Sequence, residues 1–295
     1  MTQASTPQLI LRDEAPSRGA NGRFLKFTVS QAFALGLLHG PSELLPISSS
    51  AHTALVPWLA GWPYGELDPN LRKSFEVALH AGTAAALLMR PPTGRLGGKS
   101  SFLIPALAPP ALAGYALGER VERQLGTPGT IAAGLLAGSV AIEVGEMFAR
   151  RGRPARVGAR AGWRDGLALG LAQACALFPG VSRSGATLAS ARARGFSRLD
   201  ADRLSWQAGL PVIAGATALK SVQLLGHGAP RELRLPFAAG AAGSLLSTLA
   251  GSALLTPSRR TRLLRACALY RGALALFVIR RMRDNTRQHA RPSKK

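Results

Sequence analysis

Apolar residues occur along this chain in long blocks separated by short polar segments, and not in the narrow stripes of helices on a soluble core. Eight or more blocks can be marked, and some approach the roughly 20 residues that cross the hydrocarbon core of a bilayer. Blocks that are apolar on every face indicate helices surrounded by lipid or protein. The pattern therefore predicts an all-α polytopic membrane protein. The marked blocks are residues 24–38, 51–59, 74–89, 102–117, 131–148, 166–178, 185–193, 204–225, 235–255 and 263–279.

Two short sequence matches recur at one constant offset. Ala34 to Leu37 recurs as Ala168 to Leu171, and Ile47 to Ser50 recurs as Val181 to Ser184. The shared spacing favours duplication over chance. Each half would contain a helix, a Pro/Ser-rich break, a short helix that returns to its own side as a re-entrant pair, and about three transmembrane helices. An odd number of spans inverts the second half, so the two breaks would meet near the midplane, as in many transporters.

These patterns divide the chain into three parts. Residues 1–23 are polar and lack the apolar run of a secretory signal, so we expect a flexible tail. Residues 24–282 are predicted to form a single integral membrane domain, with repeat one at about 24–149 and repeat two at about 163–281. Residues 283–295 are predicted to be a basic tail.

The formal net charge of +22 raises the question of nucleic-acid binding. The arginines lie between the apolar blocks and at both ends, without a basic helix or a basic patch interleaved with aromatic residues, which favours contact with anionic lipid instead. Four loops, 90–100, 150–164, 191–203 and 256–265, hold 17 Lys and Arg, against six in the three opposite loops. The positive-inside rule then places these four loops in the cytoplasm and both termini outside. Seven basic residues after position 279 argue the other way, but we give the internal loops more weight.

The first break, from His39 to His52, holds two histidines, one glutamate and four serines within 14 residues. Ionisable groups inside a membrane segment are costly and indicate function. Glu43 with nearby hydroxyls and an imidazole can bind a cation, move protons or position water. The alternative, that the serines cap the following helix, suits one serine but leaves Glu43 and His52 unexplained.

The second break, from Phe178 to Thr187, places Arg183 among serines and glycines. A planar guanidinium group can donate two parallel hydrogen bonds to phosphate oxygens. Ser182, Ser184 and backbone N–H groups could add donors, and a helix starting near Gly185 would point its positive end at an anion. The alternative is an arginine that extends to the membrane interface. A carboxylate and imidazole in one half and a phosphate clamp in the other suit cation-assisted phosphoryl hydrolysis.

Both breaks resemble motifs of the BacA-type undecaprenyl-diphosphatases. Residues 43–52 are similar to the family motif E-F-L-P-(V/I)-S-S-T-G-H, and residues 179–187 match P-G-x-S-R-S-G-A-T almost residue for residue. Residues 75–77 and 215–219 also fit the family pattern. The resemblance runs from about residue 24 to the final helix.

The resemblance implies a function and a set of site residues. The fold would be an inverted-repeat membrane fold in the bacterial cell membrane, and a homodimer is possible. The reaction would convert undecaprenyl diphosphate to the monophosphate and phosphate with Mg2+ or Ca2+, at a site open to the extracytoplasmic face. The implied catalytic residues are Glu43, Ser49, His52 and Arg183, while Ser48, Ser182, Ser184 and Gly185 would support phosphate binding.

One position departs from the family motif. The family usually has a second glutamate four residues before Glu43, where this chain has His39, and we expect both side chains to face one site and to bind metal. His80 could join the site or serve packing, and we give packing more weight. We expect Glu143 and Glu146 to be solvated at the interface. Two alternatives to the phosphatase stay open: a transporter or flippase of polyprenyl phosphates using the same inverted repeat, and a non-catalytic paralogue.

Overall fold

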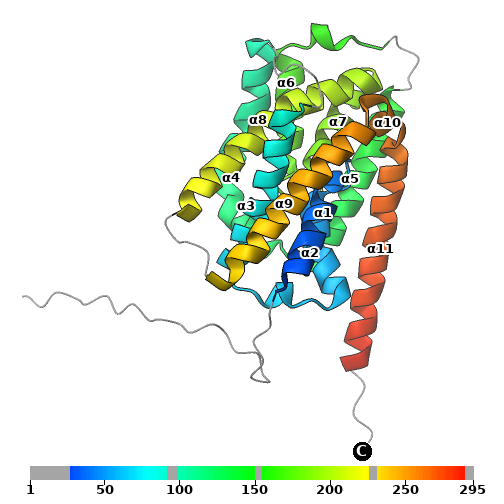
Figure 1. Cartoon of the computed structure of the whole chain (residues 1–295). Coiled ribbons are helices and arrows are strands. Elements are labelled where there is room, and N and C mark those ends of the chain that lie inside the picture. Colours follow the sequence, from blue (N-terminus) through cyan, green and yellow to red (C-terminus); the bar gives the residue numbers. More distant parts are fainter. Residues whose placement is uncertain (1–26, 92–98, 150–154, 226–230, 290–295) are drawn as a thin grey trace, which may run out of the picture.

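The computed structural model describes residues 27–91, 99–149, 155–225 and 231–289, and within these ranges the chain is helical apart from turns and one isolated bridge between Arg156 and Phe196. The long helices form a bundle, with α1 and α2 near its centre and the described ends of the chain at the same end (Figure 1). The helices are α1 (Val29–Leu44), α2 (Ser49–Ala60), η1 (Pro63–Glu66), α3 (Pro69–Met89), α4 (Ser100–Gln124), α5 (Pro128–Ala149), η2 (Gly158–Arg160), α6 (Trp163–Cys175), α7 (Arg183–Ala193), α8 (Arg198–Leu225), α9 (Arg231–Leu254), α10 (Pro257–Arg262) and α11 (Leu264–His289).

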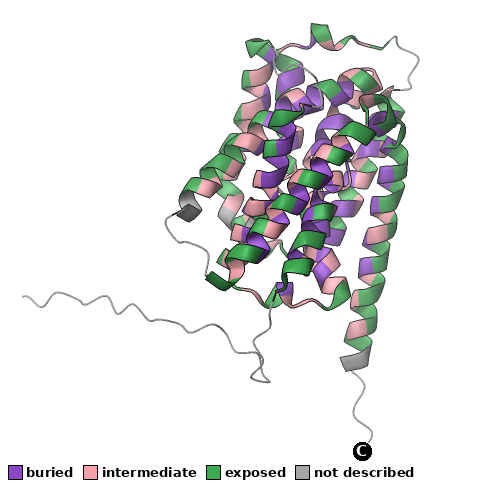
Figure 2. Ribbon diagram, viewed as in Figure 1, coloured by how far each residue is buried: buried purple, intermediate pink, exposed green. Residues whose placement is uncertain are grey.

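Three of the described helices are long and apolar enough to cross a membrane: α4 over Ser100–Gly118, α5 and α9. Large apolar side chains on the outer surface are exposed, as Tyr115, Leu112 and Ile104 of α4 illustrate, while the buried positions face the bundle interior (Figure 2). An apolar exterior of this extent suits lipid better than water. The structure therefore agrees with the predicted all-α membrane protein.

The first break follows from proline chemistry. A residue before proline is driven into the extended region, and Leu45, which precedes Pro46, has ψ 152°, so α1 ends at Leu44. Ser48 then adopts φ +76° and caps α2 by accepting a hydrogen bond from the N–H of Ala51. In Figure 1, α2 returns toward the end of the bundle at which α1 begins.

The second break has the same local design. α6 ends at Cys175, Gly180 takes φ +95°, and Ser182 takes φ +71° and caps α7 by accepting from the N–H of Gly185. Among the described residues, Ser48 and Ser182 are the two non-glycine residues with positive φ. Such backbone is strained and is held only where its surroundings require it. Both breaks therefore carry the same unusual turn at positions related by the sequence repeat.

Small residues set the depth of α1 in the bundle. A Cβ at Gly36 would collide with the carbonyl oxygen of Gly240 on α9, and a Cβ at Gly40 would collide with Thr248. Close approach of backbones through small residues is the usual way that membrane helices pack. The C-terminal half of α1, which carries His39 and Glu43, is consequently buried.

The helix ends differ from the predicted blocks because polar residues extend helices beyond their apolar parts. α3 begins at Pro69, where Asp68 caps it, and not at residue 74. α11 continues to His289, so the segment predicted as a basic tail from residue 283 is helical up to that point. The predicted N-terminal tail, residues 1–23, and the last six residues lie outside the described residues.

Glu146 corrects one prediction, since it is not solvated at the interface. It is 1% exposed and accepts hydrogen bonds from Arg192 of α7 and Arg198 of α8. Glu143, one turn earlier, is half-exposed and lies 3.4 Å from Arg265. Arg192 and Arg198 flank the turn between α7 and α8, where the N–H of Arg156 also donates to the carbonyl of Gly195.

Glu146→Gln is expected to destabilise the protein, because it leaves two guanidinium groups against an uncharged buried amide. Removing one partner of a buried ion pair costs about 3 kcal/mol or more, which should lower the thermal unfolding midpoint by about 6 °C or more in a chain of this size. Glu143→Gln is the matched control, with an expected change within about 1 kcal/mol. Equal midpoints for the two variants, measured in detergent, would contradict the structural role of Glu146.

Candidate active site

The two breaks meet through a direct contact between their charged residues. Nη2 of Arg183 lies 3.0 Å from Oε1 of Glu43, and the two side chains are only 14% and 9% exposed. The other carboxylate oxygen, Oε2, accepts a hydrogen bond of 2.6 Å from the hydroxyl of Ser49. The structure thus brings together Glu43, Ser49 and Arg183, three of the four residues predicted to be catalytic.

Arg183 retains unused hydrogen-bond donors. Its Nε and Nη1 atoms are buried and have no hydrogen-bond partner among the described residues. Its guanidinium carbon lies 5.4 Å from the ring centroid of Trp206, and Arg260 approaches the same ring at 5.6 Å. Buried N–H groups without partners are costly, and an anion beside Arg183 would satisfy both of them.

Gly209 of α8 makes the room that Arg183 occupies, because a Cβ there would collide with Nη1 of Arg183. Gly209→Ala is expected to displace the guanidinium and to lower kcat/KM for a phosphorylated substrate by about tenfold, since small displacements of positioning groups are costly. Gly215→Ala on the same helix is the control, because a Cβ there meets nothing within 4 Å. Equal kcat/KM for the two variants would contradict the proposed crowding.

The predicted phosphate-binding residues of the second break have capping roles in the structure. Ser182 accepts from the N–H of Gly185 at 3.2 Å, and its hydroxyl lies 3.3 Å from that of Ser184. The amide of Gly185 is therefore already used, and the space left by its missing Cβ is occupied by Arg271, whose Nη1 would lie 2.7 Å from such an atom. Ser48 repeats the arrangement in the first break, with its hydroxyl 3.3 Å from Ser50.

His52 is held from both sides. Its Nδ1 donates to the carbonyl of Ser48 at 2.7 Å, since a carbonyl can only accept, and its Nε2 therefore accepts from the hydroxyl of Tyr270 at 2.7 Å. The two rings are stacked with centroids 5.6 Å apart. The hydrogen bonds of the His52 ring go to the backbone of the first break and to Tyr270, and neither reaches Glu43 or Ser49.

Arg271 of α11 joins the two breaks. It is fully buried, and its guanidinium donates to the carbonyl of Pro46 at 3.1 Å in the first break and to those of Gly180 and Val181 at 3.0 and 2.7 Å in the second. Gly138 of α5 leaves space for the same group. One planar cation thus fixes the position of one break relative to the other.

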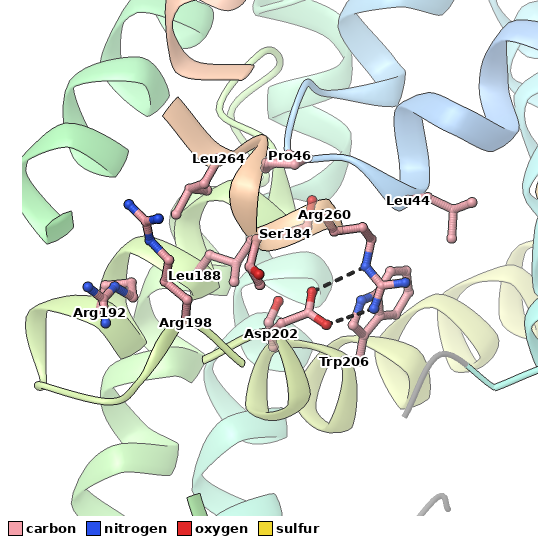
Figure 3. Close-up of a pocket in the computed structure, with 12 residues that line it drawn as sticks. Leu44, Pro46, Ser184, Leu188, Arg192, Arg198, Asp202, Trp206, Arg260 and Leu264 are labelled. Carbon is pink, nitrogen blue, oxygen red and sulfur yellow. Dashed lines mark hydrogen bonds and ion pairs between the residues drawn. The ribbon is translucent and has the colours of Figure 1, made fainter. Parts of the chain in front are cut away.

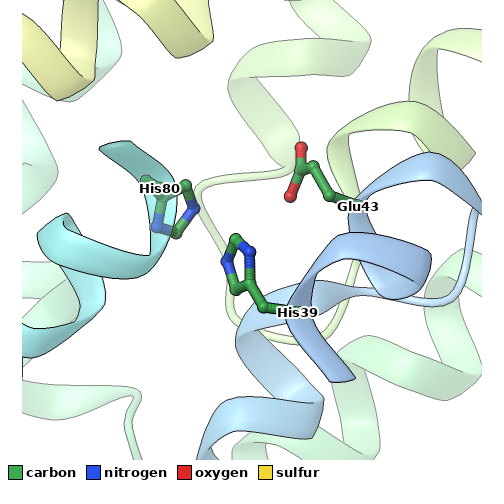
Figure 4. A group of neighbouring side chains, drawn as sticks. All are labelled: His39, Glu43 and His80. Atoms are coloured by element: carbon green, nitrogen blue, oxygen red, sulfur yellow. The ribbon is translucent and has the colours of Figure 1, made fainter. Parts of the chain in front are cut away.

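A second set of ionisable groups lies on the other side of Glu43. His39, Glu43 and His80 each offer a ligand atom within 4.8 Å of the others, and Figure 4 shows the three side chains converging. The rings of His39 and His80 lie edge to face with centroids 4.6 Å apart. Of the two interpretations of His80, joining the site or packing, this position favours the first, because its imidazole lies beside His39 and Glu43.

The chain is similar to one family of known proteins. The family model described as bacitracin resistance protein BacA matches residues 32–91 and 94–277. The chain belongs to the BacA family. A relative from Geobacter sulfurreducens named undecaprenyl-diphosphatase is 39% identical over 77% of this chain and 88% of its own. Relatives of the same name from Thermomicrobium roseum and Pelotomaculum thermopropionicum are 34% and 38% identical, over 85% and 74% of this chain and 97% and 83% of theirs.

In this BacA-family chain a small pocket lies between residues of both breaks. Leu44 and Pro46 of the first break and Ser184 of the second line it, together with residues of α7, α8 and α10 (Figure 3). Arg260 and Asp202 form a buried ion pair across it, at 2.7 Å between Nη2 and Oδ2. This pair also supports the Trp206 ring on which Arg183 lies.

Several residues of the site carry no sequence signal of their own. Tyr270 and Arg271 lie in the final apolar helix, and Thr83 and Ser244, which bind His39, lie in two other helices. The exception is Arg271, an arginine inside an apolar block, because ionisable residues in membrane segments indicate function. The family motifs do not extend to these positions.

Proposed function

We propose that this BacA-family protein hydrolyses undecaprenyl diphosphate to undecaprenyl phosphate and inorganic phosphate, and so recycles the carrier lipid of cell-wall synthesis. The observation that carries the proposal is the buried contact of Glu43 with Arg183, whose Nε and Nη1 donors have no partner among the described residues. A diphosphate supplies the anionic oxygens that such donors need. The names of the relatives indicate that the substrate is undecaprenyl diphosphate.

In this proposal Arg183 clamps the diphosphate, and the hydroxyls of Ser48, Ser182 and Ser184 surround the phosphate oxygens. The hydroxyl of Ser49 already donates to Glu43 at 2.6 Å, which is the arrangement of a nucleophile beside its base. Glu43 takes the proton as the Ser49 oxygen attacks the terminal phosphorus, and the bond from that phosphorus to the bridging oxygen breaks to release undecaprenyl phosphate. Water then cleaves the phosphoserine. His52, held by Tyr270, keeps the first break in shape and can relay protons.

A divalent cation belongs to the proposal, and the donor set suits one. Nε2 of His39 is buried and has no partner among the described residues, and it lies in the cluster with Glu43 and His80. These three residues would hold the ion. When bound it would offset the negative charge of the diphosphate.

The membrane arrangement is also proposed. The two halves would be inverted repeats, a relation that fits the packing of α1 on α9 and of α6 on α4, pairs that such a symmetry exchanges. The arginine-rich end would face the cytoplasm of the bacterial plasma membrane by the positive-inside rule. The diphosphate would enter from the extracytoplasmic side.

Phosphate release from undecaprenyl diphosphate by purified protein in detergent tests the function. We expect divalent-cation-dependent release with the wild type and a loss of about a thousandfold with Ser49→Ala or Glu43→Gln, since both remove the activated nucleophile. In proteoliposomes, movement of the lipid between leaflets without phosphate release would refute hydrolysis and indicate a transporter. Absence of both activities in folded protein would indicate a non-catalytic member.

A further inference from the structure

The cluster of His39, Glu43 and His80 contains two imidazoles and one carboxylate, and the hydrogen bonds around it determine which ring nitrogens are available. The available nitrogens decide what kind of cation the cluster can bind, because a protonated nitrogen cannot bind metal. Both imidazoles are anchored through Nδ1.

The tautomer of His39 follows from a chain of hydroxyl groups. Ser244 donates its single hydrogen to the carbonyl of Leu79 at 2.8 Å, so the 2.6 Å bond between Thr83 and Ser244 must be donated by Thr83. Neither hydroxyl then has a hydrogen left for Nδ1 of His39, which lies 2.9 Å from Thr83 and 3.3 Å from Ser244. Nδ1 is therefore the donor, and the lone pair is on Nε2.

His80 reaches the same tautomer by a simpler route. Its Nδ1 lies 2.8 Å from the carbonyl oxygen of Glu76, which can only accept, so Nδ1 carries the hydrogen. The lone pair of His80 is then on Nε2, as in His39. A metal-binding histidine typically has its other nitrogen fixed by a carbonyl or hydroxyl in this way.

We infer that this cluster is a site for a borderline transition-metal ion of the Zn2+ or Co2+ class, held by Nε2 of His39, Nε2 of His80 and the carboxylate of Glu43. Two histidines and one glutamate with an open position form a frequent catalytic zinc ligand set. Zn2+ ligands lie about 2.0–2.2 Å from the ion. One ligand atom from each of the three residues lies within 4.8 Å of the other two, so the side chains must rotate inward to close on it.

The same ligand set is poorly suited to the Mg2+ or Ca2+ that the family resemblance implies. Both are hard cations that select oxygen ligands, whereas imidazole suits first-row transition metals. Glu43 is the single carboxylate of the cluster. That the ion would act on a diphosphate rests on the proposed function, whereas binding of the ion depends only on the three side chains.

Metal binding to the purified full chain, without lipid substrate, tests this inference. The protein is prepared without a histidine tag, with His227 and His289 replaced by glutamine so that the two remaining histidines outside the breaks and α3 do not bind metal. After chelation, the metal content per chain, the visible absorption of Co2+ and the thermal midpoint are measured with each ion. We expect one Zn2+ or Co2+ per chain, bound at least about 100-fold more tightly than Mg2+ or Ca2+.

Three variants identify the ligands. His80→Ala and His39→Ala are expected to weaken Zn2+ and Co2+ binding by about 30-fold or more, while His39→Glu is expected to shift selectivity toward Mg2+ by about tenfold. His52→Gln is the matched control for binding, because that imidazole is engaged by Ser48 and Tyr270. His80 is only half-buried, so we expect His80→Ala to leave the thermal midpoint of the metal-free protein unchanged. This variant therefore tests the ligand assignment even if His39→Ala fails to fold.

Two results would overturn the inference: Mg2+ or Ca2+ competing equally with Zn2+, or His80→Ala binding Zn2+ like the wild type. Phosphate release measured separately distinguishes the two proposals. Release with Mg2+ in a protein that does not bind Zn2+ refutes the metal class and leaves the phosphatase. Stoichiometric Zn2+ binding that depends on His39 and His80, without release under any metal, supports the site and refutes the phosphatase.

Discussion

Replacement of Arg183 by alanine is expected to lower phosphate release from undecaprenyl diphosphate by about a thousandfold or more. Removing one preorganised donor from an anion site typically costs about 10²–10³ in rate, and Arg183 offers two buried donors that have no other partner among the described residues. Arg183→Lys should recover only part of the activity, because an ammonium group lacks the planar fork of the guanidinium. Steady-state phosphate release in detergent measures both variants.

A double variant separates the role of Arg183 in catalysis from its role in folding. Arg183→Ala leaves Glu43 buried without its cation, which destabilises the fold, and Arg183→Ala/Glu43→Gln should restore the thermal midpoint without restoring activity. Arg265→Ala is the control, because Arg265 is half-exposed and lies near Glu143 away from the breaks. A folded Arg183→Ala protein that keeps more than about a tenth of the wild-type rate is incompatible with the clamp.

Arg271→Met is expected to disable the enzyme without touching a reacting group. The change removes three hydrogen bonds that join Pro46 to Gly180 and Val181, and each buried carbonyl left without a donor costs about 1–3 kcal/mol. We expect kcat to fall by about 100-fold, since displaced breaks misalign Glu43 and Arg183, and the thermal midpoint to fall by about 6 °C or more.

The control for Arg271 lies on the same helix. Arg280→Met removes an exposed guanidinium of α11 and should leave both kcat and the midpoint near wild-type values. Arg271→Lys should fall between the two, because a single ammonium group cannot reach both breaks with the same geometry. If Arg271→Met lowered the midpoint but left kcat unchanged, Arg271 would support stability and not the alignment of the breaks.

Much of the helical layout and the central pair could be predicted from the sequence. The two breaks can be recognised from proline, serine and ionisable residues inside apolar sequence. The constant offset between the breaks predicts that Glu43 and Arg183 lie close to each other. The contact of 3.0 Å between these side chains agrees with that expectation. Patterns within one segment were sufficient here because the chemistry of each break is local.

The surroundings of the pair could not be predicted, because they depend on which helices touch. The hydroxyls that fix His39 come from Thr83 on α3 and Ser244 on α9, and neither position differs in sequence from an ordinary small residue in a membrane helix. Packing was given more weight for His80 for the same reason. Glu146 was expected to be solvated because it lies at the end of an apolar block beside a basic loop. Its partners, Arg192 and Arg198, come from α7 and α8, about 50 residues away.

An experimental structure with a methylene-bridged, non-hydrolysable analogue of undecaprenyl diphosphate would show whether a diphosphate binds where the two breaks meet. We expect phosphonate oxygens within hydrogen-bonding distance of Nε and Nη1 of Arg183, with the terminal phosphorus facing the hydroxyl of Ser49. A bisphosphonate bound elsewhere, with Arg183 still paired only to Glu43, would contradict it.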